Sequence, residues 1–93
     1  MNSFQTVNYK LCQNYPNPFN SETDIEFEIF KSGNATIKIY NLLGVETTEL
    51  LNENLKSGRY SIKFKADNFA SGIYYYKFSI NGYTETKKLL LIK

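Results

Sequence analysis

Four carboxylates recur at every second residue and are the first candidates for chemistry. Glu22, Asp24, Glu26 and Glu28 would line one face of a β-strand, spaced about 7 Å apart. Such a row could bind calcium, or two of its members could act as the carboxylate pair of a glycoside hydrolase. A solvent-exposed strand face carries the same pattern, and we expect that simpler explanation to hold.

Other reactive groups are scarce in this sequence. The chain has no histidine and one cysteine, which excludes Ser-His-Asp and Cys-His pairs, the usual zinc ligand sets and an internal disulfide. Cys12 has only Lys10 as a nearby cation, so we expect an unreactive thiol. The five glycines are isolated, which is unlike a phosphate-binding loop. We therefore expect no enzyme activity, no cofactor and no metal.

Three consecutive tyrosines offer a possible binding platform. Alternation along a strand would turn Tyr75 away from Tyr74 and Tyr76 and leave at least one ring near the surface. Exposed tyrosines can stack on sugars. An ordinary surface tyrosine is the simpler expectation, and carbohydrate binding stays as an alternative.

The elements that would position these residues are β-strands. The chain has 93 residues with 16% aromatic content, which suits a single domain rich in strands. Apolar and polar residues alternate over residues 25–30, 35–41, 60–65 and 73–80. Asn81-Gly82 predicts a tight hairpin, and a last strand follows it to the chain end. Residues 45–50 form a weaker strand pattern, and residues 51–58 read as a loop anchored by Leu55.

Short strands separated by turn signals predict an all-β fold, an immunoglobulin-like antiparallel β-sandwich of about seven strands. Connections at residues 51–59 and 66–72 would cross between the sheets. The first 55 residues are acidic and the remainder is basic, so we expect the two halves to lie side by side. Glu26 and Glu28 should share a sheet with Lys63 and Lys65. We expect no nucleic-acid partner and, without a long apolar run, no direct membrane insertion.

The stretch LCQNYPNPFN, residues 11–20, precedes the first strand and is called the lead-in below. Its two prolines make it stiff and extended, and they cannot donate the hydrogen bonds of a central strand. Its asparagines can bond nearby backbone groups. We expect Tyr15 and Phe19 to insert into the core, with the lead-in following a sheet edge or closing one end.

Five motifs in order give the chain a family resemblance. They are NYPNPFNSETDIEF, IKIYNLLG, SGRYSIKF, ASGIYYYKF and the terminal KKLLLIK. Together they resemble the C-terminal sorting domain of proteins exported by the type IX (Por) secretion system, over residues 11–93. Ser21 stands where this family often has proline, and Phe64-Lys65-Ala66 replaces a common turn element. The matched positions, expected to serve translocon recognition, are Asn17, Pro18, Phe19, Gly44, Gly58, Gly72, Tyr74, Lys87, Lys88, Leu89 and Lys93.

The resemblance implies a non-catalytic signal rather than an enzyme. Its expected partners are the outer-membrane type IX machinery, a sortase-like cysteine peptidase and a cargo domain fused at the N-terminal side. Residues 1–10 would be a linker or a cloning remnant, with the export signal of a longer protein elsewhere. The route would run through the periplasm to the cell surface or the extracellular space. The last strand would offer a free edge for strand addition or a homodimer. The alternative is a β-sandwich spacer or carbohydrate-binding module of a secreted hydrolase.

Overall fold

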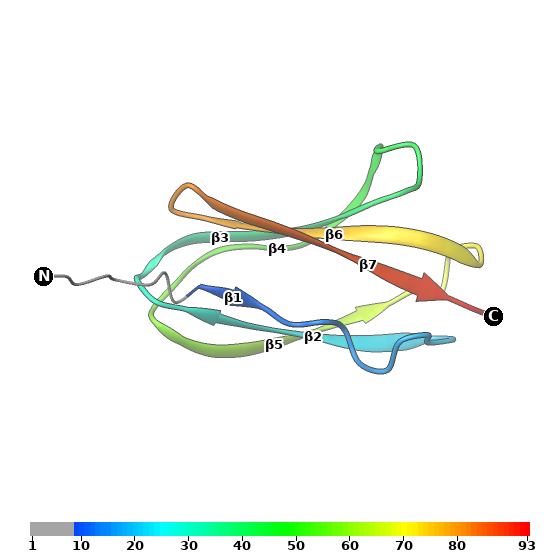
Figure 1. Ribbon diagram of the computed structural model, residues 1–93, viewed down its shortest axis with the longest axis horizontal. Coiled ribbons are helices and arrows are strands. Elements are labelled where there is room, and N and C mark those ends of the chain that lie inside the picture. Colours follow the sequence, from blue (N-terminus) through cyan, green and yellow to red (C-terminus); the bar gives the residue numbers. More distant parts are fainter. Residues whose placement is uncertain (1–8) are drawn as a thin grey trace, which may run out of the picture.

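Two antiparallel sheets lie face to face in the computed structural model, which describes residues 9–93 (Figure 1). The first sheet has the order β1-β2-β5 and the second has the order β4-β3-β6-β7. The strands are β1 (Lys10–Leu11), β2 (Glu22–Ile29), β3 (Gly33–Tyr40), β4 (Glu46–Leu55), β5 (Gly58–Lys65), β6 (Gly72–Ile80) and β7 (Tyr83–Leu91). This arrangement confirms the predicted all-β, immunoglobulin-like sandwich of seven strands.

The core lies between the sheets and is built from the alternate residues of each strand. Ile25 and Phe27 of β2 face Tyr76 and Phe78 of β6, all at most 2% exposed, and the Phe27 and Phe78 ring centroids are 5.0 Å apart. Burying each such side chain stabilises the fold by about 1.5–3 kcal/mol. The chain has no tryptophan, and phenylalanine, tyrosine and isoleucine fill the space instead.

One strand runs further than the sequence indicated. The residues expected to form a loop after position 50 continue β4 as far as Leu55, so that prediction is wrong, and only residues 56–57 cross to β5. Composition explains the difference, because Asn52, Glu53 and Asn54 are residue types that are depleted in strands. These residues nevertheless pair one-to-one with β3, and the two bulges of β4 lie before Leu51. Leu55 does pack against the core, as expected. The other crossing, after β5, occurs where it was predicted.

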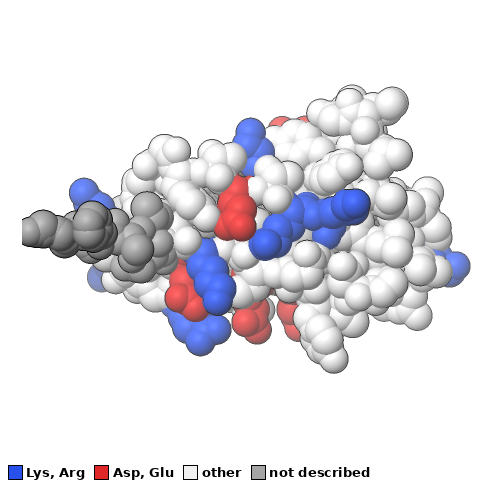
Figure 2. Space-filling model, viewed as in Figure 1, with Lys and Arg blue, Asp and Glu red and all other residues white. Residues whose placement is uncertain are grey.

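The acidic face of β2 pairs with the basic face of β5. The two strands are neighbours, which confirms the predicted sharing of a sheet, but Lys63 lies opposite Asp24 rather than Glu26. The Lys63 Nζ atom is 3.0 Å from Asp24 and 3.1 Å from Glu22, and these hydrogen bonds raise the pKa of Lys63. Figure 2 shows charges of both signs intermixed over the middle of the molecule. The carboxylate row is therefore a solvated, neutralised strand face.

The β6–β7 hairpin turns at Asn81 and Gly82, whose φ angles are 48° and 83°. Both central residues have positive φ, as a type I′ turn requires. The Asn81 amide also donates to the carbonyls of Lys31 and Ser32, at 3.1 Å each. This bond set ties the hairpin to the β2–β3 turn and fixes one end of the sandwich.

Candidate recognition site

The lead-in joins the two sheets along one side of the sandwich. Tyr15 forms an antiparallel bridge with Asp24 of β2, and Phe19 forms a parallel bridge with Leu91 of β7. Phe19 N donates to Leu90 O at 3.1 Å, and Ile92 N donates to Phe19 O at 2.8 Å. The predicted course along an edge is thus confirmed. The proline-rich segment serves as a strap between the first and last parts of the described chain.

A buried asparagine holds the strap in place. Asn14 is only 2% exposed, and its Nδ2 donates to Thr23 Oγ1 at 3.0 Å and to Pro16 O at 3.2 Å. Its backbone N donates to the Tyr76 hydroxyl at 2.8 Å, and that hydroxyl donates to Cys12 O at 2.7 Å. Burial raises the pKa of Tyr76. These bonds satisfy polar groups that would otherwise be costly to bury.

The two aromatic residues of the lead-in differ in burial. Phe19 is 3% exposed and packs against Phe64 with 6.0 Å between ring centroids, as expected. Tyr15 is 79% exposed, so the prediction that it inserts into the core is wrong. The physical reason is that its neighbour Asn14 takes the inward position, which turns the Tyr15 ring to solvent. Sequence reasoning foresaw the backbone bonding of Asn14 but not its burial.

The end of β7 is already occupied by the lead-in. Leu90 N donates to Asn17 Oδ1 at 3.0 Å, and the Gln13 side chain donates to Lys88 O at 2.7 Å. Together with the Phe19 bonds, these contacts cover the outer edge of β7 from Lys88 onward. The predicted free edge, and a homodimer formed through it, are therefore wrong for this part of the strand, because its backbone groups already have partners.

The other half of β7 is also held from the side. The Glu85 carboxylate accepts from Leu11 N at 3.3 Å and from the Tyr83 hydroxyl at 2.5 Å, and it lies 3.5 Å from Lys87 Nζ. Burial opposes ionisation of Glu85, but these donors outweigh it and lower its pKa. Burial and the same bond raise the pKa of Tyr83 to about 12. This cluster was not apparent from the sequence.

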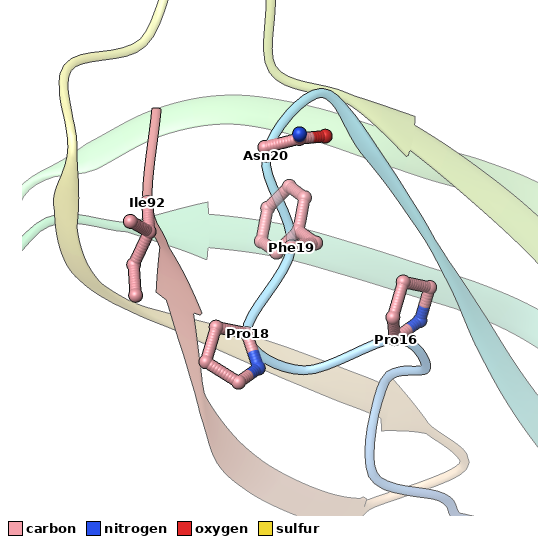
Figure 3. A pocket seen from close by; sticks show the side chains of 5 residues that line it. All are labelled: Pro16, Pro18, Phe19, Asn20 and Ile92. Atoms are coloured by element: carbon pink, nitrogen blue, oxygen red, sulfur yellow. The ribbon is translucent and has the colours of Figure 1, made fainter.

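A shallow hollow of about 320 Å³ opens where the lead-in meets the chain end (Figure 3). Its lining is Pro16, Pro18, Phe19, Asn20 and Ile92. Ile92 is 52% exposed and borders the hollow from the side opposite Pro16 (Figure 3). Mostly apolar walls without an ionisable side chain suit the binding of an apolar group.

The predicted recognition residues do not all lie in one place. Most of them gather around the hollow or directly behind it: Phe19 and Gly72 both pair with Leu91, and Lys93 N donates to Ser71 Oγ at 2.9 Å. Gly58 pairs with Ile29 at the opposite end. The members near the hollow are Asn17, Pro18, Phe19, Gly72, Tyr74, Leu89 and Lys93.

The remaining predicted residues lie apart from the hollow. Lys87 and Lys88 lie along the middle of β7, and Gly44 lies in the β3–β4 turn. Among the members near the hollow, Leu89 and Tyr74 point into the core, at 0% and 9% exposure. These two act as structural members of the fold. The exposed members near the hollow are Asn17, Pro18 and Lys93, whereas Gly44, Gly58 and Lys88 are exposed elsewhere.

Over residues 9–93 the structure contains no group of three or more potential metal ligands among His, Cys, Asp and Glu. It also contains, in that range, no helix able to span a membrane. The fold and the site thus define a β-sandwich module whose distinctive feature is a surface, formed where an N-terminal strap closes over the last strand.

Comparison with known proteins identifies the family. A family model described as the secretion system C-terminal sorting domain matches residues 13–93. The chain therefore belongs to the type IX secretion C-terminal sorting domain family, as its motifs indicated. The sorting domain is non-catalytic, and membership implies export to the cell surface or extracellular space. Searches of curated proteins and of solved structures returned no significant match.

Proposed function

We propose that the type IX translocon in the outer membrane recognises this domain at the hollow where the lead-in meets the end of β7. Recognition would direct a cargo fused at the N-terminal side from the periplasm across the outer membrane. The observation that carries this proposal is the set of bonds from Asn17 and Phe19 to Leu90 and Ile92. These bonds bring motif residues from both ends of the sequence into one surface.

The arrangement leaves room for a cargo domain. Tyr9, the first described residue, packs against Tyr83 beside the Asn81 turn, with 5.3 Å between ring centroids. Lys93 lies at the other end of the sandwich, where Lys93 Nζ donates to Asp67 O (Figure 1). A cargo attached ahead of Tyr9 would therefore leave the domain far from the hollow. A sortase-like peptidase that removes the domain would act on that same upstream side.

A reporter fusion tests this function. A folded reporter placed ahead of the whole chain should be found outside a bacterium that has the type IX system. It should stay in the periplasm when the translocon is deleted. Retention in the periplasm with the translocon intact would refute the proposal.

A pair of matched variants locates the signal within the domain. Ile92→Asp places a charge in the apolar hollow, and Thr84→Asp places the same charge on an exposed position at the other end of β7, far from the hollow. We expect only Ile92→Asp to reduce export. Both proteins should unfold near the wild-type temperature, since both positions are exposed.

A second candidate function is a carbohydrate-binding accessory module. Tyr75 is half-buried on the outer face of β6 and lies opposite Tyr40 of β3, a pair of rings that could stack on a sugar. Saturable binding to a polysaccharide, lost in Tyr75→Ala, would favour this function over sorting.

A further inference from the structure

Exposed apolar side chains gather at one end of the molecule. Seven large hydrophobic residues among those described are exposed, and only Phe30 lies at the end of the Asn81 turn. In Figure 2 the end of the molecule away from the grey N-terminal residues shows few charged side chains. The six at this end are Tyr15, Leu42, Leu43, Val45, Ile73 and Ile92. A concentrated apolar surface on a small domain is typical of an interaction site.

The most exposed part of this surface is residues 42–45, called the tip below. Leu43 is 87% exposed, and Leu42 and Val45 are 62% and 56% exposed. The tip belongs to the β3–β4 turn, which rises away from the sandwich (Figure 1). It is separate from the hollow, since neither Leu42 nor Leu43 lines it.

The backbone of the tip is fixed by its own hydrogen bonds. Asn41 Oδ1 accepts from Leu43 N at 2.9 Å and from Val45 N at 3.0 Å. Asn41 O accepts from Gly44 N at 2.9 Å, and Gly44 has a φ of 82°. The turn therefore presents its apolar side chains in one arrangement. Such preorganisation lowers the ordering cost when a partner binds.

The outer face of the four-stranded sheet changes from apolar near the tip to basic further along the strands. The first cross-strand pair is apolar, Ile73 with Leu90, and Tyr75 follows it between Tyr40 and Lys88. The next row is basic, because Lys38 lies directly opposite Lys77. Like charges placed opposite each other destabilise a sheet by a few tenths of a kcal/mol. Lys38 Nζ lies 3.7 Å from Glu46 Oε1, which offsets part of this repulsion. Lys77 takes part in none of the ion pairs of residues 9–93, so its charge is available to an acidic partner.

We propose that the tip and the lysine row behind it form a second docking surface, for a receptor protein of the secretion machinery with an apolar pocket and an acidic rim. This inference rests on the proposed function and names a surface that the hollow does not include. A protein fits better than an anionic lipid layer, because Glu46 follows the tip and lies opposite Tyr40, and Glu49 lies opposite Lys38. An anionic lipid layer would repel these carboxylates over its whole surface, whereas a folded protein can place its acidic groups opposite Lys77 and away from Glu46 and Glu49.

The test uses the reporter fusion with the full chain. A double variant, Leu42→Ser with Leu43→Ser, removes the apolar contacts of the tip, and Phe30→Ser removes an exposed apolar residue, 49% exposed, at the other end as a matched control. We expect export of the double variant to fall about tenfold or more, the effect of losing contact residues worth roughly 1.4 kcal/mol. Phe30→Ser should be exported like the wild type. The turn bonds use backbone groups and Asn41, so thermal unfolding should confirm that the double variant is folded.

The possible outcomes separate this inference from the proposed function. If the wild-type fusion is not exported, the sorting function itself fails. If the wild type and the folded double variant are exported equally, the docking surface at the tip is refuted while sorting stands. If the purified domain co-sediments with phosphatidylglycerol vesicles and the double variant does not, the tip binds lipid, and the receptor proposal is overturned.

Discussion

The substitution Tyr76→Phe probes how firmly the lead-in is held. It deletes one hydroxyl that makes two hydrogen bonds, accepting from Asn14 N at 2.8 Å and donating to Cys12 O at 2.7 Å. Tyr76 is 0% exposed and Asn14 is 2% exposed. The aromatic ring and its packing remain, so the change reports on the hydrogen bonds alone.

The expected cost follows from the two groups that lose their partner. A hydrogen bond contributes about 1 kcal/mol net, and a buried group left unsatisfied costs about 1–3 kcal/mol. We therefore expect the free energy of unfolding to fall by about 2–4 kcal/mol. For a domain of this size that corresponds to a decrease in melting temperature of at least about 10 °C.

Urea and thermal denaturation measure this loss, and hydrogen exchange at the Asn14 amide shows where it occurs. Tyr74→Phe is the control, because its hydroxyl makes one bond, to Ala70 O at 2.7 Å, and its loss should cost only about 0.5–1.5 kcal/mol. A Tyr76→Phe protein within 0.5 kcal/mol of the wild type would contradict the claim that these bonds secure the lead-in.

Three further predictions follow from the same contacts. Phe19→Ala should lower the free energy of unfolding by about 3–5 kcal/mol in denaturant titrations, since this buried ring fills the end of the core. Tyr15→Ala should change the free energy of unfolding by less than about 0.5 kcal/mol. Equal effects of the two substitutions would contradict the assigned orientations of the two rings. Gly82→Ala forces an alanine to a φ of 83° and should cost about 1–2 kcal/mol, and an unchanged melting temperature would argue against the hairpin. The pKa of Tyr83, raised to about 12 by burial and the Glu85 carboxylate, implies a loss of stability at high pH. The unfolded chain ionises this hydroxyl first, so its contribution is complete below about pH 10 and disappears as the pH rises to about 12; Tyr83→Phe should make this decline shallower, and an identical pH profile would contradict the raised pKa.

The sequence predicted those parts of the fold that depend on local alternation and turn chemistry. Strands such as β2 and β6 alternate cleanly, and their buried faces follow directly from the period of two. Asn81-Gly82 marks its hairpin because few other residues tolerate positive φ. The shared sheet of β2 and β5 was visible in their complementary charges, although the pairing register was not.

Features that depend on distant contacts could not be predicted in the same way. The second half of β4 carries Asn52, Glu53 and Asn54, residue types that are depleted in strands, so it resembled a loop until its pairing with β3 was known. In the lead-in, tyrosine is the more apolar residue, yet Asn14 is buried because Tyr76 and Thr23 supply its hydrogen bonds. Those partners lie up to 62 positions away in the chain, and no local pattern reveals them.

The candidate site combines both cases. Family motifs named Asn17, Phe19 and Lys93, but only the structure shows that the lead-in covers the edge of β7 and turns a free strand end into part of a hollow. The exposure of the tip was not predicted either, because the turn at residues 41–44 does not by itself show that Leu42 and Leu43 face solvent.

Binding of the purified domain to the purified outer-membrane translocon of a type IX system tests the central claim most directly. Surface plasmon resonance should show saturable binding that excess free domain competes away. Ile92→Asp should weaken this binding about tenfold or more, and Thr84→Asp should leave it unchanged. Absence of saturable binding, or equal binding by the two variants, would contradict the claim that the translocon reads the surface formed by the lead-in and the last strand.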